Sequence, residues 1–511
     1  MSDSANRVGK PHGGMKFFFL GTSFWAGTTV MAFELVGARL LMPLFGMGIQ
    51  IWTIVIATSL AALAIGYWLG GKIIDSLPSV ITLAVVLLLA TVSLVFVLVL
   101  GRNIPTLFEN MSLVTGACCS AISIIAGPLL LLGMVQPVLA RLLIRTADRT
   151  GTIVGSLMAA GTTGGIFGTV LTGLLLIPYL GLSKTLFILV LGMLAAAIAA
   201  LSCTHKWTIT VGAIIIGAPA IVAGWTIKFP LQPIGAMRVL EEVEGLYGHL
   251  EVLEYRGTHA LVCNGIFQTV MPTLGLGIVR GTLIRGRDYI ELIPYFRPEA
   301  RTGLLIGVGA GLYNRMLMLY GIEVYGVEIE PAVVLLAEKY FDLAAEVDVM
   351  DGRAFLVRDQ KRYDAVIIDT FLGGIPPEHL YTKEAFQLVD EHLNRDGVLA
   401  VRLIGHPEQP AIQAVTRTVK EVFPYMVAVR SGIANELQDV FIFASQTALE
   451  LGGVGRLELS MYGFTGEEFC DINTFDAPLL TDDKSNLALL SSELVAEHRH
   501  NLLKLRGEPL W

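Results

Sequence analysis

The stretch Gly303-Leu304-Leu305-Ile306-Gly307-Val308-Gly309-Ala310-Gly311 is a short apolar run that leads directly into alternating glycines. Such a run is typical of a buried strand, and the glycines after it allow a tight turn, a close approach to a ligand and the start of a helix. Glu328 ends the next predicted strand, where an acidic side chain can accept both hydroxyls of a ribose. This spacing predicts a nucleoside-binding α/β unit.

Outward from this stretch, short apolar runs and helical patterns alternate, which is typical of a mostly parallel, doubly wound sheet. Asp351 and Gly352 follow the third predicted strand and Asp369 follows the fourth, so these residues share one edge of the sheet with Gly307 and Glu328. A carboxylate after the third strand can accept a hydrogen bond from an adenine amino group. The predicted strands lie at 303–307, 324–328, 347–350, 365–368 and 398–401, and the helices at 313–320 and 332–340.

The pocket predicted at this edge suits a nucleoside that carries positive charge, because Asp369 directs a carboxylate into it. NAD fits less well. A dinucleotide fold would place its third glycine three residues after the second, and no cationic group waits here for a pyrophosphate. The chain has a net charge of −8 with no basic patch in its second half, which excludes nucleic acid as a partner.

The first half of the chain has a different composition. Residues 1–228 contain 12 Lys and Arg and 5 Asp and Glu, against 36 and 44 in all 511 residues. We therefore predict a polytopic helical membrane bundle over 1–228, a small β-hairpin region over 229–300 with strands near 250–255 and 260–263, and a Rossmann-like domain over 301–511. Seven apolar stretches long enough to cross a bilayer lie near 16–41, 50–71, 79–101, 112–138, 151–178, 182–203 and 207–227.

Two features of the predicted bundle stand out. Glu34 lies inside the first span, where a carboxylate costs free energy unless it is paired or hydrated, so it is a candidate functional residue of the membrane domain. Gly161, Gly164, Gly165 and Gly168 would leave one side of a helix flat, which favours close packing against a second helix. The five cysteines form no CxxC pair and the histidines are scattered, so we expect neither a metal site nor a disulfide framework.

The orientation that the Lys and Arg residues favour for the bundle conflicts with the location of the predicted ligand. The distribution of Lys and Arg favours a cytoplasmic N-terminus, and seven spans would then place the C-terminal half on the far side of the cell membrane. The adenosyl ligand, however, is made in the cytosol. We give the ligand more weight and expect a multi-pass inner-membrane protein with a cytoplasmic catalytic domain.

These residues resemble the spermidine synthase (aminopropyltransferase) family, in the branch that is fused to a transporter-like membrane domain. The resemblance covers essentially the whole chain. In the membrane half, 34–39 and 66–71 are similar to the fused branch. In the second half, the matching motifs are Tyr247-Gly248-His249-Leu250, Asn264-Gly265-Ile266-Phe267-Gln268, Tyr289-Ile290-Glu291 (without the family's central His), 307–312, Val327-Glu328-Ile329-Glu330, Asp351-Gly352, 363–369, 375–380 and 480–483.

The resemblance implies a fold, a ligand and a set of site residues. It implies S-adenosylmethionine or its decarboxylated form as a substrate-like cofactor, no metal, and a homodimer formed through the C-terminal half. Asp369 and Tyr247 would be catalytic. The residues that would bind the adenosyl group are Gln268, Tyr289, Gly307, Gly309, Gly311, Glu328, Ile329, Asp351 and Gly352.

Two departures from the family pattern bear on the substrate. The family has carboxylates that welcome the aminopropyl ammonium group where this chain has Ala310 and Leu372, whereas Glu328, Asp351 and Asp369 remain. The loss of negative charge there would relieve repulsion toward a ligand that keeps its carboxylate. We therefore expect intact S-adenosylmethionine as the substrate.

In intact S-adenosylmethionine, the carboxylate can attack the chain carbon bonded to sulfur. This closes homoserine lactone and releases 5′-methylthioadenosine, with the rate advantage of an intramolecular reaction. Tyr247, Gln268 and Asp369 would orient the chain in this lyase reaction. Aminopropyl transfer to a polyamine stays open, although it needs acidic acceptor residues that the sequence does not locate. Methyl transfer also stays open, as does a transporter with a regulatory binding domain, in which Glu34 and the glycine-rich span carry the function.

Overall fold

The computed structural model describes residues 13–45, 49–101, 103–108, 111–144, 150–203, 237–255, 257–264, 266–272, 280, 283, 288–343, 345–371, 376–431 and 439–491. The chain divides into two compact units, of which the first comprises Met1–Leu41 and Gln50–Leu231 and the second Met42–Ile49 and Gln232–Trp511.

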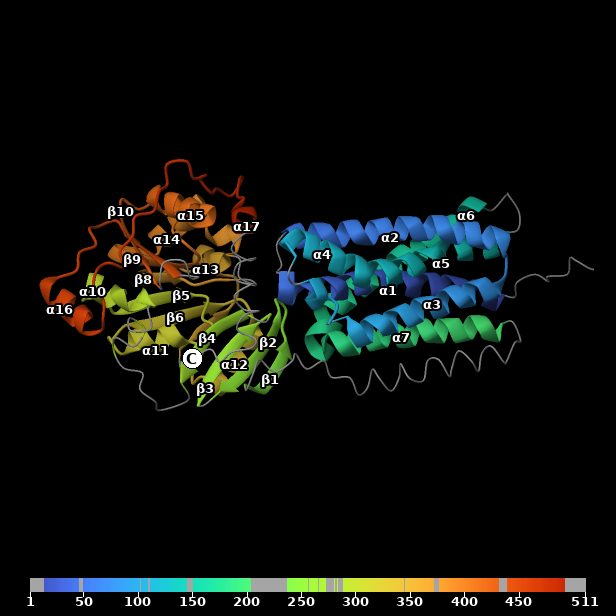
Figure 1. The fold of residues 1–511 in the computed structure, drawn as a ribbon, viewed down its shortest axis with the longest axis horizontal. Helices are drawn as coiled ribbons and strands as arrows, with labels where there is room; N and C mark the ends of the chain where they lie inside the picture. The colour runs from blue at the N-terminus through green and yellow to red at the C-terminus, as the bar shows by residue number, and fades with distance from the viewer. Residues whose placement is uncertain are drawn as a thin grey trace, which may run out of the picture. The chain divides into compact units, whose positions relative to one another are not determined.

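The first unit is helical wherever the structure describes regular elements (Figure 1). Within it, α3 packs against α5 and α7, and α5 packs against α6. Two short π-helical turns, η2 and η4, interrupt the longer helical runs. The elements are α1 (Gly13–Phe45), α2 (Ile49–Ser76), α3 (Val80–Leu100), η1 (Pro105–Phe108), α4 (Leu113–Ala121), η2 (Ile122–Ala126), α5 (Gly127–Leu143), α6 (Thr150–Leu171), η4 (Thr172–Leu176) and α7 (Ile177–Ser202).

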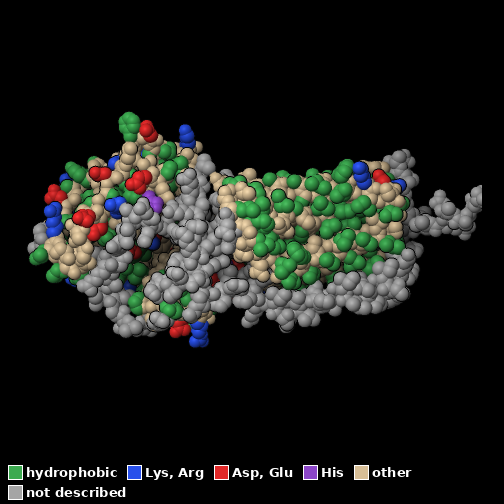
Figure 2. Space-filling model, viewed as in Figure 1, with side chains coloured by type: hydrophobic (Ala, Val, Ile, Leu, Met, Phe, Trp, Pro, Cys, Tyr) green, Lys and Arg blue, Asp and Glu red, His purple; other side chains and the backbone are tan. Residues whose placement is uncertain are grey.

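Among the described residues, five helical stretches are long and apolar enough to cross a membrane. They are Met15–Met42, Gln50–Ser76, Val80–Leu100, Val114–Leu143 and Thr150–Ser202. Large apolar side chains such as Leu60, Ile166 and Leu174 are exposed on them, and hydrophobic atoms cover most of the bundle face seen in Figure 2. An apolar exterior of this kind suits contact with lipid.

The seven spans that we predicted are not confirmed by the described residues. The last stretch has 53 residues and a break at Gly181, whose φ of 77° is not helical. This stretch contains both predicted spans, 151–178 and, but for its last residue, 182–203. At about 1.5 Å per residue its length is more than twice the roughly 30 Å of a bilayer core, which is long enough for two spans. The span predicted at 207–227 lies outside the described residues.

Polar and small side chains join neighbouring helices of this unit. The Ser23 hydroxyl donates to the carbonyl oxygen of Leu157 at 2.8 Å and accepts from the Gln136 amide at 2.9 Å. The Thr28 hydroxyl donates to the Gly164 carbonyl oxygen at 2.9 Å. All four glycines of the predicted flat face are buried. This arrangement is typical of close helix packing in apolar surroundings.

We expect Gly164→Ala to lower the free energy of unfolding in detergent by about 1–3 kcal/mol, because the added Cβ would collide with the carbonyl oxygen of Phe24. Gly155→Ala on the same helix is the matched control, since no described heavy atom lies within 4 Å of its Cβ position. That change should be neutral or stabilise by up to about 1 kcal/mol through helix propensity. Unfolding by titration with sodium dodecyl sulfate measures both. Equal destabilisation by the two variants would contradict the close contact.

Glu34 lies in α1, and its carboxyl group is half-buried beside the hydroxyl of Ser59 on α2. A neutral hydroxyl is a weaker partner for a carboxylate than a cation is. No contact among the described residues tests the functional role expected for Glu34, so this role stays a prediction.

The second unit begins with a four-stranded antiparallel sheet in the order β1-β2-β3-β4. Its strands are β1 (Arg238–Glu244), β2 (His249–Tyr255), β3 (Thr258–Cys263) and β4 (Ile266–Pro272). The side chains of Leu250, Val252 and Leu261 on this sheet pack with Val333 and Leu336 of α12 (Pro331–Tyr340). The small hairpins that we predicted are therefore part of a larger sheet, which is held to the following α/β fold by an apolar cluster.

The larger sheet has seven strands in the order β10-β11-β9-β8-β5-β6-β7. The strands β5 (Thr302–Ile306), β6 (Glu323–Glu328), β7 (Val347–Val349), β8 (Tyr363–Ile368) and β9 (Leu393–Ile404) are parallel. The strands β10 (Tyr425–Arg430) and β11 (Asp439–Ser445) add an antiparallel edge. The chain runs outward from β5 to β7 and then returns to β8 on the other side of β5. That reversal is where open α/β sheets bind ligands.

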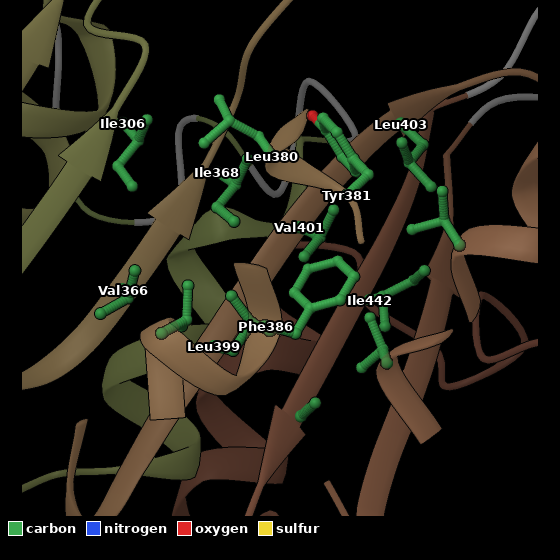
Figure 3. Close-up of a cluster of buried hydrophobic side chains, with 14 of the residues drawn as sticks. Ile306, Val366, Ile368, Leu380, Tyr381, Phe386, Leu399, Val401, Leu403 and Ile442 are labelled. Atoms are coloured by element: carbon green, nitrogen blue, oxygen red, sulfur yellow. The ribbon is translucent and has the colours of Figure 1, made fainter. Parts of the chain in front are cut away.

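Both faces of the seven-stranded sheet are covered, because side chains alternate along each strand and both sets are apolar. Ile306, Val366, Ile368 and Leu399 belong to one cluster that also contains Phe386, and Figure 3 shows Leu399 close to the Phe386 ring. The alternate residues of the same strands enter a second cluster. The other helices are η5 (Tyr289–Leu292), α10 (Ile293–Phe296), α11 (Leu312–Met318), α13 (Gly352–Arg358), η6 (Glu378–Leu380), α14 (Lys383–Glu391), α15 (Pro410–Lys420), α16 (Gly453–Met461) and α17 (Leu487–Leu490).

Candidate active site

A cavity of about 330 Å³ lies at the carboxyl ends of β5, β6, β8 and β9, and residues of the four-stranded sheet close its other side. Its volume is within the usual range of small-molecule sites. Most of the residues predicted from the sequence line it. They are Tyr247, Gln268, Gly307, Gly309, Glu328, Ile329, Asp351, Gly352 and Asp369.

The glycine loop after β5 has backbone dihedral angles that residues other than glycine adopt only with strain. Gly307 has a φ of 90° and Gly309 a φ of 54°, both in the left-handed region. The Gly307 N–H donates to the carbonyl oxygen of Val327, and the Asp369 N–H donates to that of Ile306, both at 2.9 Å. The loop therefore passes close to the ends of β6 and β8.

We expect Gly307→Ala to lower the free energy of unfolding by about 3 kcal/mol, because it adds left-handed strain and a collision of Cβ with the carbonyl oxygen of Asp369. Gly321→Ala is a matched control. Its φ is 80°, but no described heavy atom lies within 4 Å of the Cβ position, so strain alone should cost about 1–2 kcal/mol. Thermal unfolding of the detergent-solubilised chain compares the two. A smaller loss for Gly307→Ala than for the control would contradict the close approach.

Glu328 joins the glycine loop to the end of β6. Its Oε2 atom accepts from the N–H groups of Val308 at 3.1 Å and Gly309 at 3.3 Å, and its Oε1 accepts from the Glu330 N–H at 3.1 Å. Burial raises the pKa of Glu328, and these backbone N–H groups oppose the rise. The carboxylate is thus held rigidly at the cavity wall, where it can accept from two ribose hydroxyls.

Asp351 lies at the start of α13, on the wall formed after β7. Its Oδ1 atom accepts from the Ala354 N–H at 2.9 Å, and its Oδ2 lies 2.7 Å from Nε2 of His379. Burial favours a higher pKa for Asp351, but the Ala354 N–H and His379 together hold it below its ordinary value. Asp351 is therefore an acceptor at the adenine end of the cavity, next to the imidazole of His379, which lies in the 375–380 motif but was not predicted as a site residue.

The four-stranded sheet contributes Tyr247 and Gln268 to the opposite wall. The Tyr247 N–H donates to Oε2 of Glu330 at 2.7 Å, and Glu330 also accepts from Ala332 at the start of α12. Next to Gln268, the Thr269 hydroxyl accepts from the Ala310 N–H at 3.3 Å. These hydrogen bonds hold the turn before β2 next to α12 and strand β4 next to the glycine loop. They thereby keep Tyr247 and Gln268 at the cavity.

Asp369, at the end of β8, faces a guanidinium group. Nη1 of Arg402 lies 3.3 Å from one carboxylate oxygen of Asp369, and Nη2 lies 3.1 Å from Asp439. Burial raises the pKa of Asp369; Arg402 opposes this shift and Asp439 adds to it. The end of the cavity away from Asp351 therefore contains a buried group of charges.

Asp288 also belongs to this group of charges, because Arg402, Asp439 and Asp369 all act on its carboxyl group. Asp288 and Arg402 line the cavity, and sequence reasoning missed both. Asp288 directly precedes the Tyr289-Ile290-Glu291 motif, and Arg402 directly follows the predicted strand 398–401. The rule that site residues follow parallel strands could have found Arg402. The sequence offers no comparable signal for Asp288, which follows no strand.

Three residues that the sequence singled out are not among the described residues that line the cavity. Tyr289, the first residue of η5, lies in the second apolar cluster with its ring edge-on to Phe441. Gly311 is also absent from the lining and instead begins α11 with a φ of 81°. Ala310 packs into the apolar cluster below α12. Leu372 lies outside the described residues.

Comparison with known proteins gives a family and several relatives. Residues 290–448 match the spermine/spermidine synthase domain family. A probable polyamine aminopropyl transferase of Bifidobacterium longum is 30% identical over 188 residues, which are 36% of this chain and 42% of that protein. An N-terminal histidine N-methyltransferase of Emericella nidulans is 34% identical over 150 residues, 27% of each protein. The chain thus spans less than half the length of these two relatives.

Among solved structures, a probable spermidine synthase from Corynebacterium glutamicum matches with a TM-score of 0.40 and 15% identity. That match covers 48% of this chain and 97% of the other.

Proposed function

We propose, from the premise that the C-terminal part of this chain is a spermine/spermidine synthase domain, that the chain is an aminopropyltransferase-type enzyme. In this proposal, the cavity binds decarboxylated S-adenosylmethionine and an amine acceptor. The observation that supports it best is the charge at the two ends of the cavity. Glu328 and Asp351 suit an adenosine, and Asp288 and Asp369 supply carboxylates for cations at the other end. Asp288 is an acidic group that the sequence did not locate, whereas Asp369 was predicted from the end of its strand.

The proposed reaction is a displacement at the chain carbon bonded to the sulfonium. The lone pair of the acceptor amine forms a bond to this carbon, the carbon–sulfur bond breaks, and its electron pair moves to sulfur to give neutral methylthioadenosine. Positive charge moves from sulfur to nitrogen, and a fixed carboxylate such as Asp369 stabilises it on the way. Tyr247 and Gln268 line the same cavity and would position the transferred chain.

A lyase that acts on intact S-adenosylmethionine is the second candidate, and Arg402 is the observation that favours it. The guanidinium lines the cavity beside Asp369, where it could bind the carboxylate of the methionine chain. Arg402 is already paired with two aspartates, however, and Ala310 packs into the core rather than the described lining. Both observations weaken the argument for the lyase.

The test is an incubation of the detergent-purified full-length chain with each donor, followed by mass spectrometry of the small molecules. The donors are S-adenosylmethionine and its decarboxylated form, each with and without putrescine or spermidine. Methylthioadenosine that appears only with the decarboxylated donor and an amine would support the transferase.

The other outcomes would point to other functions. Acceptor-free release of methylthioadenosine with homoserine lactone would establish the lyase instead. S-adenosylhomocysteine would indicate methyl transfer, the activity that the name of the Emericella nidulans relative states. Unchanged donors in every vial would favour a binding or transport function.

We further propose that the helical unit spans the inner membrane in contact with lipid, that the catalytic unit lies in the cytoplasm, and that the chain forms a homodimer. The five apolar helical stretches support membrane insertion, and the cytosolic origin of adenosyl sulfonium compounds supports the orientation. Protease accessibility in inverted and right-side-out vesicles tests the orientation, because a cytoplasmic catalytic unit is cleaved only in inverted vesicles.

A further inference from the structure

Asp288 is held at the cavity by contacts from several parts of the fold. Its backbone N–H donates to the carbonyl oxygen of Leu283 at 2.7 Å. The hydroxyl of Tyr313, on α11 just after the glycine loop, donates to its Oδ2 at 2.8 Å. Tyr313 also lines the cavity. These contacts fix the Asp288 carboxyl group at the cavity lining.

Four charged or titratable groups face Asp288 from the elements packed around it. They are Tyr313 on α11, Asp369 after β8, Arg402 on β9 and Asp439 at the start of β11. Arg402 forms ion pairs with Asp369 and Asp439, and among the residues described no ion pair joins it to Asp288. Within the part of the chain that the structure describes, Asp288 therefore differs from Asp369, which pairs directly with Arg402.

Resting on the proposed transferase function, we infer that Asp288 is a further catalytic residue, which accepts the proton of the attacking amine. The acceptor arrives as an ammonium ion, and one N–H proton passes to the Asp288 carboxylate. The freed lone pair forms the carbon–nitrogen bond as the carbon–sulfur bond breaks toward sulfur. Methylthioadenosine and a secondary ammonium product leave, and Asp288 loses its proton to water.

The properties of the neighbours suit this role. Burial raises the pKa of Asp288 to about 7, with Arg402 opposing the shift, and a base with such a value is efficient near neutral pH. Burial also raises the pKa of Tyr313 well above its ordinary value, so its phenol stays a hydrogen-bond donor. Below a pH of about 7, Asp288 would hold a proton and could not accept another, so the rate should fall as the pH decreases.

The experiment is a pH profile of kcat for the full-length enzyme with saturating decarboxylated S-adenosylmethionine and putrescine. For the wild type we expect an acid limb near pH 7. In Asp288→Asn the limb should move toward the titration of the amine itself, about pH 10, and kcat at pH 7.5 should fall about 10²-fold or more. The KM for the donor should change by less than about threefold, a split that a merely structural role would not produce.

Two further variants keep the inference testable if Asp288→Asn does not fold. Tyr313→Phe removes a hydrogen bond that lowers the pKa of Asp288, so the acid limb should move to higher pH. Asp439→Asn removes a negative charge that raises this pKa, so the limb should move to lower pH. An acid limb that stays in place in all these variants would overturn the role of Asp288 while leaving the transferase intact. Absence of methylthioadenosine from the wild type would instead refute the proposed function.

Discussion

Asp369→Asn is expected to reduce the kcat for methylthioadenosine release about 10²- to 10³-fold while the KM for the donor stays within about threefold. The amide keeps the shape of the side chain but removes the negative charge that faces the reacting centre. Loss of one preorganised electrostatic contact at a buried site typically costs a rate factor of this size. The fold should survive, because Arg402 retains its 3.1 Å ion pair with Asp439.

The measurement is a time course of methylthioadenosine by mass spectrometry at saturating donor and acceptor. Asp348→Asn is a suitable control, since Asp348 is an exposed acid on β7 of the same sheet, outside the cavity lining. It should leave kcat unchanged. Unimpaired turnover by Asp369→Asn would remove Asp369 from the catalytic machinery, and would favour a unit that only binds its ligand.

Glu328→Gln is expected to weaken the binding of methylthioadenosine about 10- to 100-fold. The Glu328 carboxylate accepts from the backbone N–H groups of Val308, Gly309 and Glu330 and still faces the cavity. An amide group replaces one acceptor oxygen by an N–H₂ donor, which would point either at these N–H groups or at the ribose hydroxyls. A hydrogen bond to a charged group contributes about 1.5–3 kcal/mol, and each 1.4 kcal/mol is about tenfold in affinity.

Isothermal titration of the full-length chain with methylthioadenosine measures this loss. Glu323→Gln is the matched control, because Glu323 lies at the other end of β6 and is exposed. Its dissociation constant should equal that of the wild type. Equal affinities of Glu328→Gln and the control would show that Glu328 supports the glycine loop without contacting a ligand, and thermal unfolding of the two variants would then reveal that structural contribution.

Much of the cavity could be predicted because it follows a local rule. Glu328 ends a parallel strand, Asp351 and Asp369 come just after two others, and the carboxyl ends of parallel strands meet at one edge of a sheet. The positions of these three residues therefore depend only on recognising the strands. Tyr289 shows where the rule stops, since it follows no strand and a motif match alone placed it at the ligand. The structure instead puts it in the core beside Phe441.

The membrane half shows a similar division. Composition and the length of apolar runs were sufficient to predict long apolar helices, because a bilayer sets the same requirement for every span. The break at Gly181 lies at the boundary between the two spans predicted at 151–178 and 182–203, whereas nothing in the apolar runs located the π-helical turns η2 and η4. The buried glycines of α6 were predictable as a stripe, whereas their contacts with Phe24 and Thr28 required the folded bundle.

The charges at the far end of the cavity could not be predicted. Asp288 and Arg402 are distant in sequence, yet Asp288 at the start of η5 and Arg402 on β9 line the same cavity. Local sequence patterns determine strands, helices and the residues at their ends, since hydrophobic periodicity and glycine turns act over short distances. The pairing of Arg402 with Asp369 and Asp439, and the proton-accepting environment of Asp288, arise from burial and from charges brought together by long-range packing.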